Sequence, residues 1–322
     1  RADMDALAVI EDTGLDFAST NGYMHACGHD LHMAMGIGAA HLVAENKDKL
    51  NGNVLMFFQP GEEGHDGAGH MLAQKMHMVS GEKPIAAYGL HVFSLPEPGI
   101  FMTRKDTLMA SAGDMIVKIS GRGGHGSMPW TAQDPITGMI EILSTMQSYI
   151  AKNIDALDPI VVNVGWIKAG DDHTTNIIPE TVSFGATVRS FSKKGYADTR
   201  EKLPAFITKM AESLGLTAEV EFSPATKVLI NHHQPVDRVE ALTKEMFGAE
   251  RYFNMPAPIP GGEDFASILE EIPGAFVFLG AAYSGLAPNE RESNHSNKAK
   301  YNEDVMADGA ALLAALAFDA LS

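Results

Sequence analysis

The chain has 322 residues and a formal net charge of −17, with 24 Lys and Arg residues against 41 Asp and Glu residues. This charge excludes nucleic acid as the main partner, because binding to a phosphate backbone requires clustered basic side chains that displace counterions. The hydrophobic fraction of 45% predicts a folded core. No apolar run approaches the roughly 20 residues of a membrane-spanning helix, so we expect no spanning segment and no membrane partner.

The first residues show neither an initiator Met nor a signal-peptide pattern, since the sequence opens on Arg1-Ala2-Asp3. We expect that a further stretch of the first domain precedes them in the natural protein. Cys27 is the single cysteine and cannot form an internal disulfide, so the sequence is compatible with a reducing compartment. We therefore expect a cytoplasmic protein.

The first third of the chain alternates helical patterns with apolar runs of strand length, which is typical of an α/β domain with a largely parallel sheet. The expected elements are a helix over Leu31–Ala44, a strand over Asn53–Gln59, a helix over Gly67–Met76 and a strand over Ile85–Val92.

From about Ala112 the pattern changes to strands with one solvated face, in which apolar and polar residues alternate. Antiparallel strands packed against two helices are the natural interpretation. The expected strands are Asp114–Ser120, Thr181–Phe191 and Thr217–Phe222, and the expected helices are Asp134–Lys152 and Gly195–Leu214.

After residue 223 the α/β pattern returns, with a buried strand and three helices. At 322 residues the chain exceeds what one core usually supports, so the middle block is interpreted as a second domain inserted into the first. The predicted domains are therefore 1–111 together with 224–322, and 112–223. The returning elements are the strand Ala275–Gly280 and helices over Pro235–Phe247, Glu263–Glu271 and Glu303–Leu321.

Two short segments of the first block carry side chains that could bind a metal or move protons. Cys27 and His29 lie two residues apart at an expected helix N-terminus, which lowers a thiol pKa and favours the thiolate. Glu62 and Glu63 follow an apolar strand, at the end of a sheet where ligands bind. The alternatives are a buried thiol beside solvated histidines and a solvated acidic turn.

Two histidines complete the set of candidate ligands. His91 stands at the end of another apolar strand, where a lone histidine is more often a hydrogen-bonded core residue. His295 lies in a polar loop before the last helix and indicates little by itself. Together the four segments supply sulfur, nitrogen and oxygen donors, a combination that suits a borderline divalent metal.

A competing motif is the run Gly121-Arg122-Gly123-Gly124-His125-Gly126, which matches G-x-G-x-x-G. In a dinucleotide site the last glycine opens a helix, whereas the helical pattern here begins only near Asp134. A dinucleotide oxidoreductase is therefore disfavoured. The sequence contains no phosphate-loop, zincin or G-x-S-x-G motif.

Nine motifs in order along the chain resemble those of the metal-dependent aminoacylase/carboxypeptidase amidohydrolases of peptidase family M20. They are RADMDAL, MHACGHDLH, QPGEEG, GLHV, GGHGSMP, TNIIP, ATVRSF, GGEDF and the C-terminal NH. The resemblance implies an α/β catalytic domain with a mixed sheet, like that of di-metal exopeptidases. It also implies an inserted ferredoxin-like α+β domain that serves as a lid or in dimerisation.

The resemblance also implies roles for individual residues. Glu62 matches the catalytic base, and His125 matches a histidine that helps to stabilise the oxyanion. Asn176 and Arg189 match polar residues that face the substrate. The positions that match metal ligands, for two divalent ions such as Zn or Mn, Co or Ni, are Cys27, His29, Glu63, His91 and His295.

The function implied is hydrolysis of the amide bond of an N-acyl amino acid by a homodimer. A dipeptidase and a biosynthetic deacylase of the same family are alternatives that the sequence does not separate. A further alternative is a metal-binding scaffold that has kept the site without turnover. The donor set leaves the metal open among Zn, Mn, Co and Ni.

Overall fold

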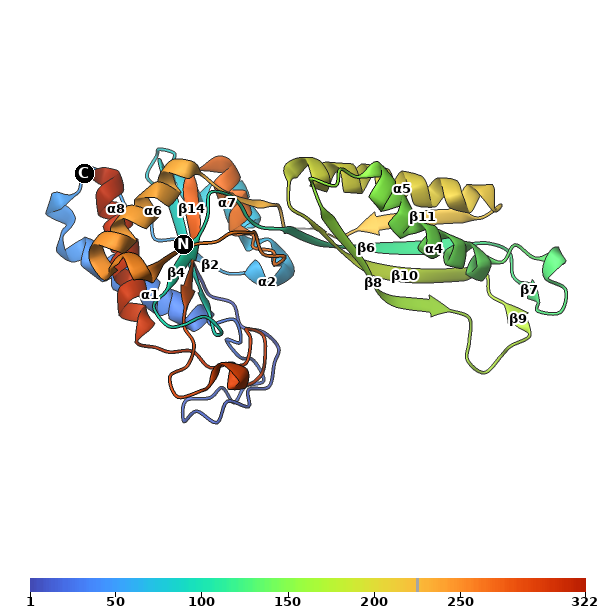
Figure 1. Ribbon diagram of the computed structural model, residues 1–322, viewed down its shortest axis with the longest axis horizontal. Helices are drawn as coiled ribbons and strands as arrows, with labels where there is room; N and C mark the ends of the chain where they lie inside the picture. Colours follow the sequence, from blue (N-terminus) through green and yellow to red (C-terminus); the bar gives the residue numbers. More distant parts are fainter. Residues whose placement is uncertain (224–225) are drawn as a thin grey trace. The chain divides into compact units, whose positions relative to one another are not determined.

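The computed structural model describes residues 1–223 and 226–322, and its contacts separate the chain into two compact units. The first unit comprises Arg1–Leu108, Leu229–Pro258 and Asp264–Ser322. The second comprises Met109–Val228 and Ile259–Glu263, and most of it is coloured green to yellow in Figure 1. The predicted domain boundary after residue 223 adjoins residues 224–225, which lie outside the described part.

The first unit is built on a mixed four-stranded sheet with the order β13-β4-β14-β3. Strand β14 is parallel to β3 over its whole length and antiparallel to β4, whereas β13 is parallel to β4. Every residue of β14 is buried, as expected of a central strand covered on both faces. The strands are β3 (Ala87–Phe93), β4 (Phe101–Thr103), β13 (Tyr252–Asn254) and β14 (Gly274–Gly280).

Helices and shorter strands complete this unit. The helices are α1 (His29–Glu45), α2 (Glu62–His65), α3 (Gly67–Ala73), α6 (His233–Phe247), α7 (Phe265–Glu271) and α8 (Val305–Leu321). The short strands are β1 (Ala2–Asp3), β2 (Phe58–Gln59), β5 (Asp106–Met109) and β12 (Leu229–Asn231). Among the described residues no helix combines the length and the apolar character needed to cross a bilayer.

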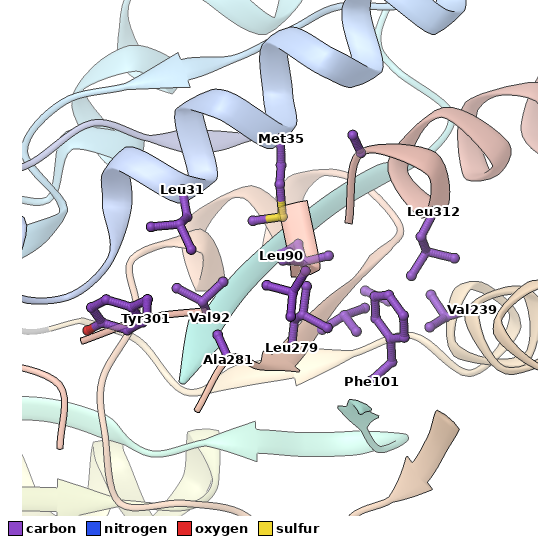
Figure 2. Close-up of a cluster of buried hydrophobic side chains, with 14 of the residues drawn as sticks. Leu31, Met35, Leu90, Val92, Phe101, Val239, Leu279, Ala281, Tyr301 and Leu312 are labelled. Atoms are coloured by element: carbon purple, nitrogen blue, oxygen red, sulfur yellow. The ribbon is translucent and has the colours of Figure 1, made fainter. Parts of the chain in front are cut away.

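The core of the first unit lies where α1, α6 and α8 pack against the sheet. Figure 2 shows Leu31 and Met35 of α1 above Leu90 and Val92 of β3. The same cluster includes Val239 of α6, and further members are Phe101, Leu279, Tyr301 and Leu312. This packing anchors the start of α1 and the end of β3, the two positions from which candidate ligands project.

The expected strand Asn53–Gln59 is wrong in its extent. Only Phe58–Gln59 is a strand, and it pairs in parallel with β1. Phe57 accepts a single backbone hydrogen bond from Ala2 at 2.9 Å, and residues 53–56 have no neighbouring strand among the described residues. Strand structure depends on such pairing. They lie instead along a cavity of about 520 Å³ whose lining includes Val54, Leu55, Phe57, Ile85 and Tyr88.

The second unit has the βαββαβ order of a ferredoxin-like fold, with an antiparallel sheet of order β11-β6-β10-β8. The predicted α+β fold is confirmed, although strand β8 was not foreseen. Its elements are β6 (Ser111–Ser120), α4 (Pro135–Asn153), β8 (Ile160–Ala169), β10 (Thr181–Ser190), α5 (Lys193–Ser213) and β11 (Thr217–Phe222). A separate pair consists of β7 (Gly124–His125) and β9 (Ile177–Ile178).

Candidate metal centre

The start of α1 brings Cys27 and His29 into the interior through a turn at Gly28. Gly28 has φ +80°, the left-handed conformation that glycine adopts without a steric penalty. A Cβ atom at this position would lie 2.5 Å from Val92 Cγ2. The turn can therefore approach β3 this closely only because glycine has no side chain. The Cys27-Gly28-His29 segment is therefore held against the strand that carries His91.

Replacing Gly28 with Ala is expected to destabilise the protein by roughly 1–3 kcal/mol, because the backbone conformation and the contact with Val92 are both unfavourable. Gly14→Ala is the matched control, since Gly14 also has a positive φ of +68° but a Cβ atom added there would meet no heavy atom within 4 Å. Urea unfolding of both variants separates the cost of the backbone conformation from the cost of the contact with Val92. Equal unfolding midpoints would show that the contact with Val92 costs nothing.

Cys27, His29 and His91 form a first group of donors, in which one ligand atom from each residue lies within 4.8 Å of the others. The Cys27 Sγ atom is 3.4 Å from His91 Nε2. His91 Nδ1 lies 2.8 Å from the Val92 carbonyl oxygen, which can only accept, so Nδ1 carries the hydrogen and donates it. The lone pair of Nε2 is thereby directed to the side of Cys27.

His29 is fully buried, yet neither of its ring nitrogens has a hydrogen-bond partner. Its Nδ1 atom is 3.3 Å from Asp3 Oδ1, which leaves the Nε2 atom available to bind a metal. Burial lowers the pKa of His29 and lowers that of His91 further, which favours the neutral imidazole, the form that binds a metal. Buried nitrogens without partners are uncommon and indicate a ligand position.

A second group consists of Cys27, Glu63 and His295, whose ligand atoms also lie within 4.8 Å of one another. His295 Nε2 is 3.2 Å from Cys27 Sγ and 3.3 Å from Glu63 Oε1. This contact with the Glu63 carboxylate raises the pKa of His295, and burial partly offsets the rise. The loop is secured by the His295 N–H, which donates to the Ala26 carbonyl oxygen at 2.7 Å.

The two groups share the Cys27 sulfur, and together they contain the five predicted metal ligands. Sulfur, nitrogen and oxygen donors in two overlapping triads fit a pair of borderline divalent ions. Glu62 belongs to a further cluster with Asp3 and His29, which places its carboxylate beside the first group. The structure thus brings all six residues predicted for this centre together within the first unit.

Three neighbouring residues were not predicted to serve the site. The buried Asp3 faces His29, and its Oδ2 is 2.6 Å from the Arg1 guanidinium. Asn294 donates from Nδ2 to the carbonyl oxygens of Cys27 and Val92, at 3.2 and 3.0 Å. The third is Asp5. The sequence signal for these residues was their position: Asp3 and Asp5 lie inside the RADMDAL motif, and Asn294 directly precedes His295.

The predicted residues of the second unit do not all gather in one place. His125 in β7 pairs opposite Ile177, and the Asn176 carbonyl oxygen accepts from Gly126 N–H at 2.8 Å, so His125 and Asn176 are neighbours. Arg189 stands near the far end of β10, where its guanidinium donates to the carbonyl oxygens of Gly113 and Val188. Within this unit Arg189 is separated from the other two.

A family model, described as peptidase family M20/M25/M40, matches residues 1–319. The chain belongs to this family. An IAA-amino acid hydrolase (ILR1-like 4) of Arabidopsis thaliana is 35% identical over 98% of the chain and 71% of its own length. An N-acetyldiaminopimelate deacetylase of Leuconostoc mesenteroides is 34% identical over 96% of the chain and 77% of its own length.

Among M20 structures, the YXEP protein of Bacillus subtilis superimposes with a TM-score of 0.82 and 29% identity, over 99% of the chain and 80% of its own length. That protein is described as a dinuclear metal binding peptidase. The family and these relatives confirm the predicted class of enzyme, an amidohydrolase, and the predicted fold.

Proposed function

We propose that this M20 protein hydrolyses the amide bond of N-acyl amino acids with the help of two divalent metal ions. The observation that supports this proposal best is the pair of donor groups that share Cys27, one of which includes the buried His29, whose Nε2 has no hydrogen-bond partner. The relatives named for the hydrolysis of amino acid conjugates and for deacetylation indicate the substrate class. The donor set suits Zn, Mn, Co or Ni.

The proposed roles follow from the chemistry of each side chain. Cys27, His29 and His91 would hold one ion, and Cys27, Glu63 and His295 the other. When bound, such ions polarise the amide carbonyl and lower the pKa of water towards neutrality. The Glu62 carboxylate would take the proton of the attacking water and return it to the leaving nitrogen, so that a carboxylic acid and a free amino acid are released.

The remaining proposed roles belong to residues of the second unit and rest on the resemblance. A ring N–H of His125 would donate to the developing oxyanion, the kind of contact that is worth about 2.7 to 4 kcal/mol. Asn176, which neighbours His125, would contact a polar group of the amino acid. A guanidinium matches the geometry of a carboxylate, but the role of Arg189 stays a prediction, because its guanidinium donates to the carbonyl oxygens of Gly113 and Val188. A homodimer and a cytoplasmic location belong to the same proposal, supported by the resemblance and by the single cysteine.

The experiment is a panel of N-acetyl, N-benzoyl and long-chain N-acyl amino acids, incubated with purified protein that carries Zn²⁺ or Mn²⁺ or has been freed of metal by a chelator. We expect release of the free amino acid only with metal, and restoration of activity when metal is returned to the depleted protein. Dipeptides in the same panel distinguish a dipeptidase. Zn²⁺ binding without turnover of any of these substrates would favour the scaffold alternative and contradict the proposal.

A further inference from the structure

The loop that carries Glu62 and Glu63 is not held by a regular helix. Gly61 has φ +81°, Glu63 has ψ +70° and Gly64 has φ +84°, so the backbone turns several times within α2. A loop of this kind lacks the repeating hydrogen bonds of a helix, and its N–H groups need other acceptors. Two of these N–H groups find their acceptor in Asp5, near the start of the chain.

The Asp5 carboxylate accepts hydrogen bonds on both sides of Glu62. Asp5 Oδ1 accepts from Gly61 N–H at 2.7 Å, and Oδ2 accepts from Glu63 N–H at 3.0 Å. The two bonds therefore fix the backbone immediately before and immediately after Glu62. Hydrogen bonds from backbone N–H groups to a carboxylate are charge-assisted, which makes them stronger than bonds between neutral groups.

Asp5 also links this loop to the other parts of the centre. Its carbonyl oxygen lies 2.7 Å from His25 Nδ1, and His25 stands two residues before Cys27. Its own N–H donates to Asp3 Oδ1 at 3.2 Å, the oxygen that faces His29. Asp5 thus contacts the three segments that carry Glu63, Cys27 and the partner of His29.

We infer that Asp5 is a positioning residue that orients Glu62 for proton transfer and Glu63 for metal binding. The inference rests on the proposed function but assigns Asp5 no contact with metal or substrate. Its carboxylate acts through the backbone of the loop. Without that carboxylate, the N–H groups of Gly61 and Glu63 lose the acceptor that sets the direction of both side chains.

The test compares Asp5→Asn with Asp66→Asn. Each substitution removes one negative charge and keeps the shape of the side chain. The Asp66 carboxylate also accepts a hydrogen bond from a backbone N–H group, that of Gly69 at 3.2 Å. Zn²⁺ affinity is measured by titration calorimetry against a competing chelator, and kcat and KM are measured at saturating Zn²⁺. Unfolding of the metal-free proteins shows whether each variant folds.

We expect Asp5→Asn to weaken Zn²⁺ binding at one of the two positions by about 10- to 100-fold, the usual effect of removing an outer partner of a ligand. Saturating Zn²⁺ should restore occupancy but not kcat, because Glu62 stays misdirected, while KM stays close to the wild-type value. Asp66→Asn should match the wild type in both measurements. If Asp5→Asn does not fold, Asp5→Glu is tested instead, because it keeps the negative charge but moves the acceptor oxygens. Weaker Zn²⁺ binding and a lowered kcat at saturating Zn²⁺ are expected from this variant as well.

Equal Zn²⁺ affinity and equal kcat for the wild type and the Asp5 variant would overturn the positioning role. A variant that regains full kcat at saturating Zn²⁺ would overturn it as well, since the effect would then be one of charge on metal affinity alone. Failure of the wild type to release an amino acid from any substrate of the panel with Zn²⁺ or Mn²⁺ would instead contradict the proposed function, so the two failures are distinguishable.

Discussion

The Glu62→Gln protein is expected to bind both metal ions and to hydrolyse N-acyl amino acids about 10²- to 10⁴-fold more slowly than the wild type. A carboxamide keeps the size of the side chain but has no carboxylate oxygen that can take up the proton of water at neutral pH. Glu62 lies beside Asp3 and His29 and outside the two donor groups that share Cys27. The loss should therefore appear in kcat at saturating metal.

The adjacent Glu63 provides a matched comparison for this prediction. Glu63→Gln makes the same chemical change one residue further on, but it removes an oxygen that belongs to the group of Cys27 and His295. It should weaken metal binding, and added Zn²⁺ should recover part of its activity. Steady-state kinetics and Zn²⁺ titration of both variants test the assignment, and the reverse pattern would exchange the roles of the two glutamates.

The fold was predictable from the sequence wherever a segment carries its own pattern. Thr217–Phe222 alternates polar and apolar residues and is the strand β11 with the same bounds. The apolar run around Ala275 is the buried strand β14. Residues 53–57 are equally apolar but are not a strand, because a strand also requires a neighbour to pair with and the sequence of a segment does not reveal one.

The sequence alone predicted which residues of the candidate site could bind metal. It did not predict the residues that orient them. Cysteine, histidine and paired glutamates at strand and helix ends are recognisable by residue type and position. Asp5 accepts from Gly61, 56 residues away in the chain, and Asn294 donates to Cys27, 267 residues away. Only the fold shows contacts between residues so far apart in the sequence. Arg189 was assigned by resemblance, and its place on β10 away from His125 depends on strand register, which the motif does not contain.

Cys27→Ser is expected to lower the affinity for both metal ions, because the Cys27 sulfur is the atom that the two donor groups have in common. A serine hydroxyl is a weaker ligand than a thiolate for borderline metals. The loss should exceed the roughly 10- to 100-fold that removal of an outer partner causes. His295→Ala is the control, because His295 belongs to one group only and its loss should leave the group of Cys27, His29 and His91 intact.

Zn²⁺ titration of the two variants distinguishes a shared ligand from two independent sites. A shared ligand predicts that Cys27→Ser weakens both binding events and that His295→Ala weakens one. Independent sites predict that each variant weakens one event and leaves the other at wild-type affinity. Because Cys27 Sγ lies within reach of both His91 Nε2 and His295 Nε2, at 3.4 and 3.2 Å, the first pattern is expected, and the second would show that Cys27 serves a single ion.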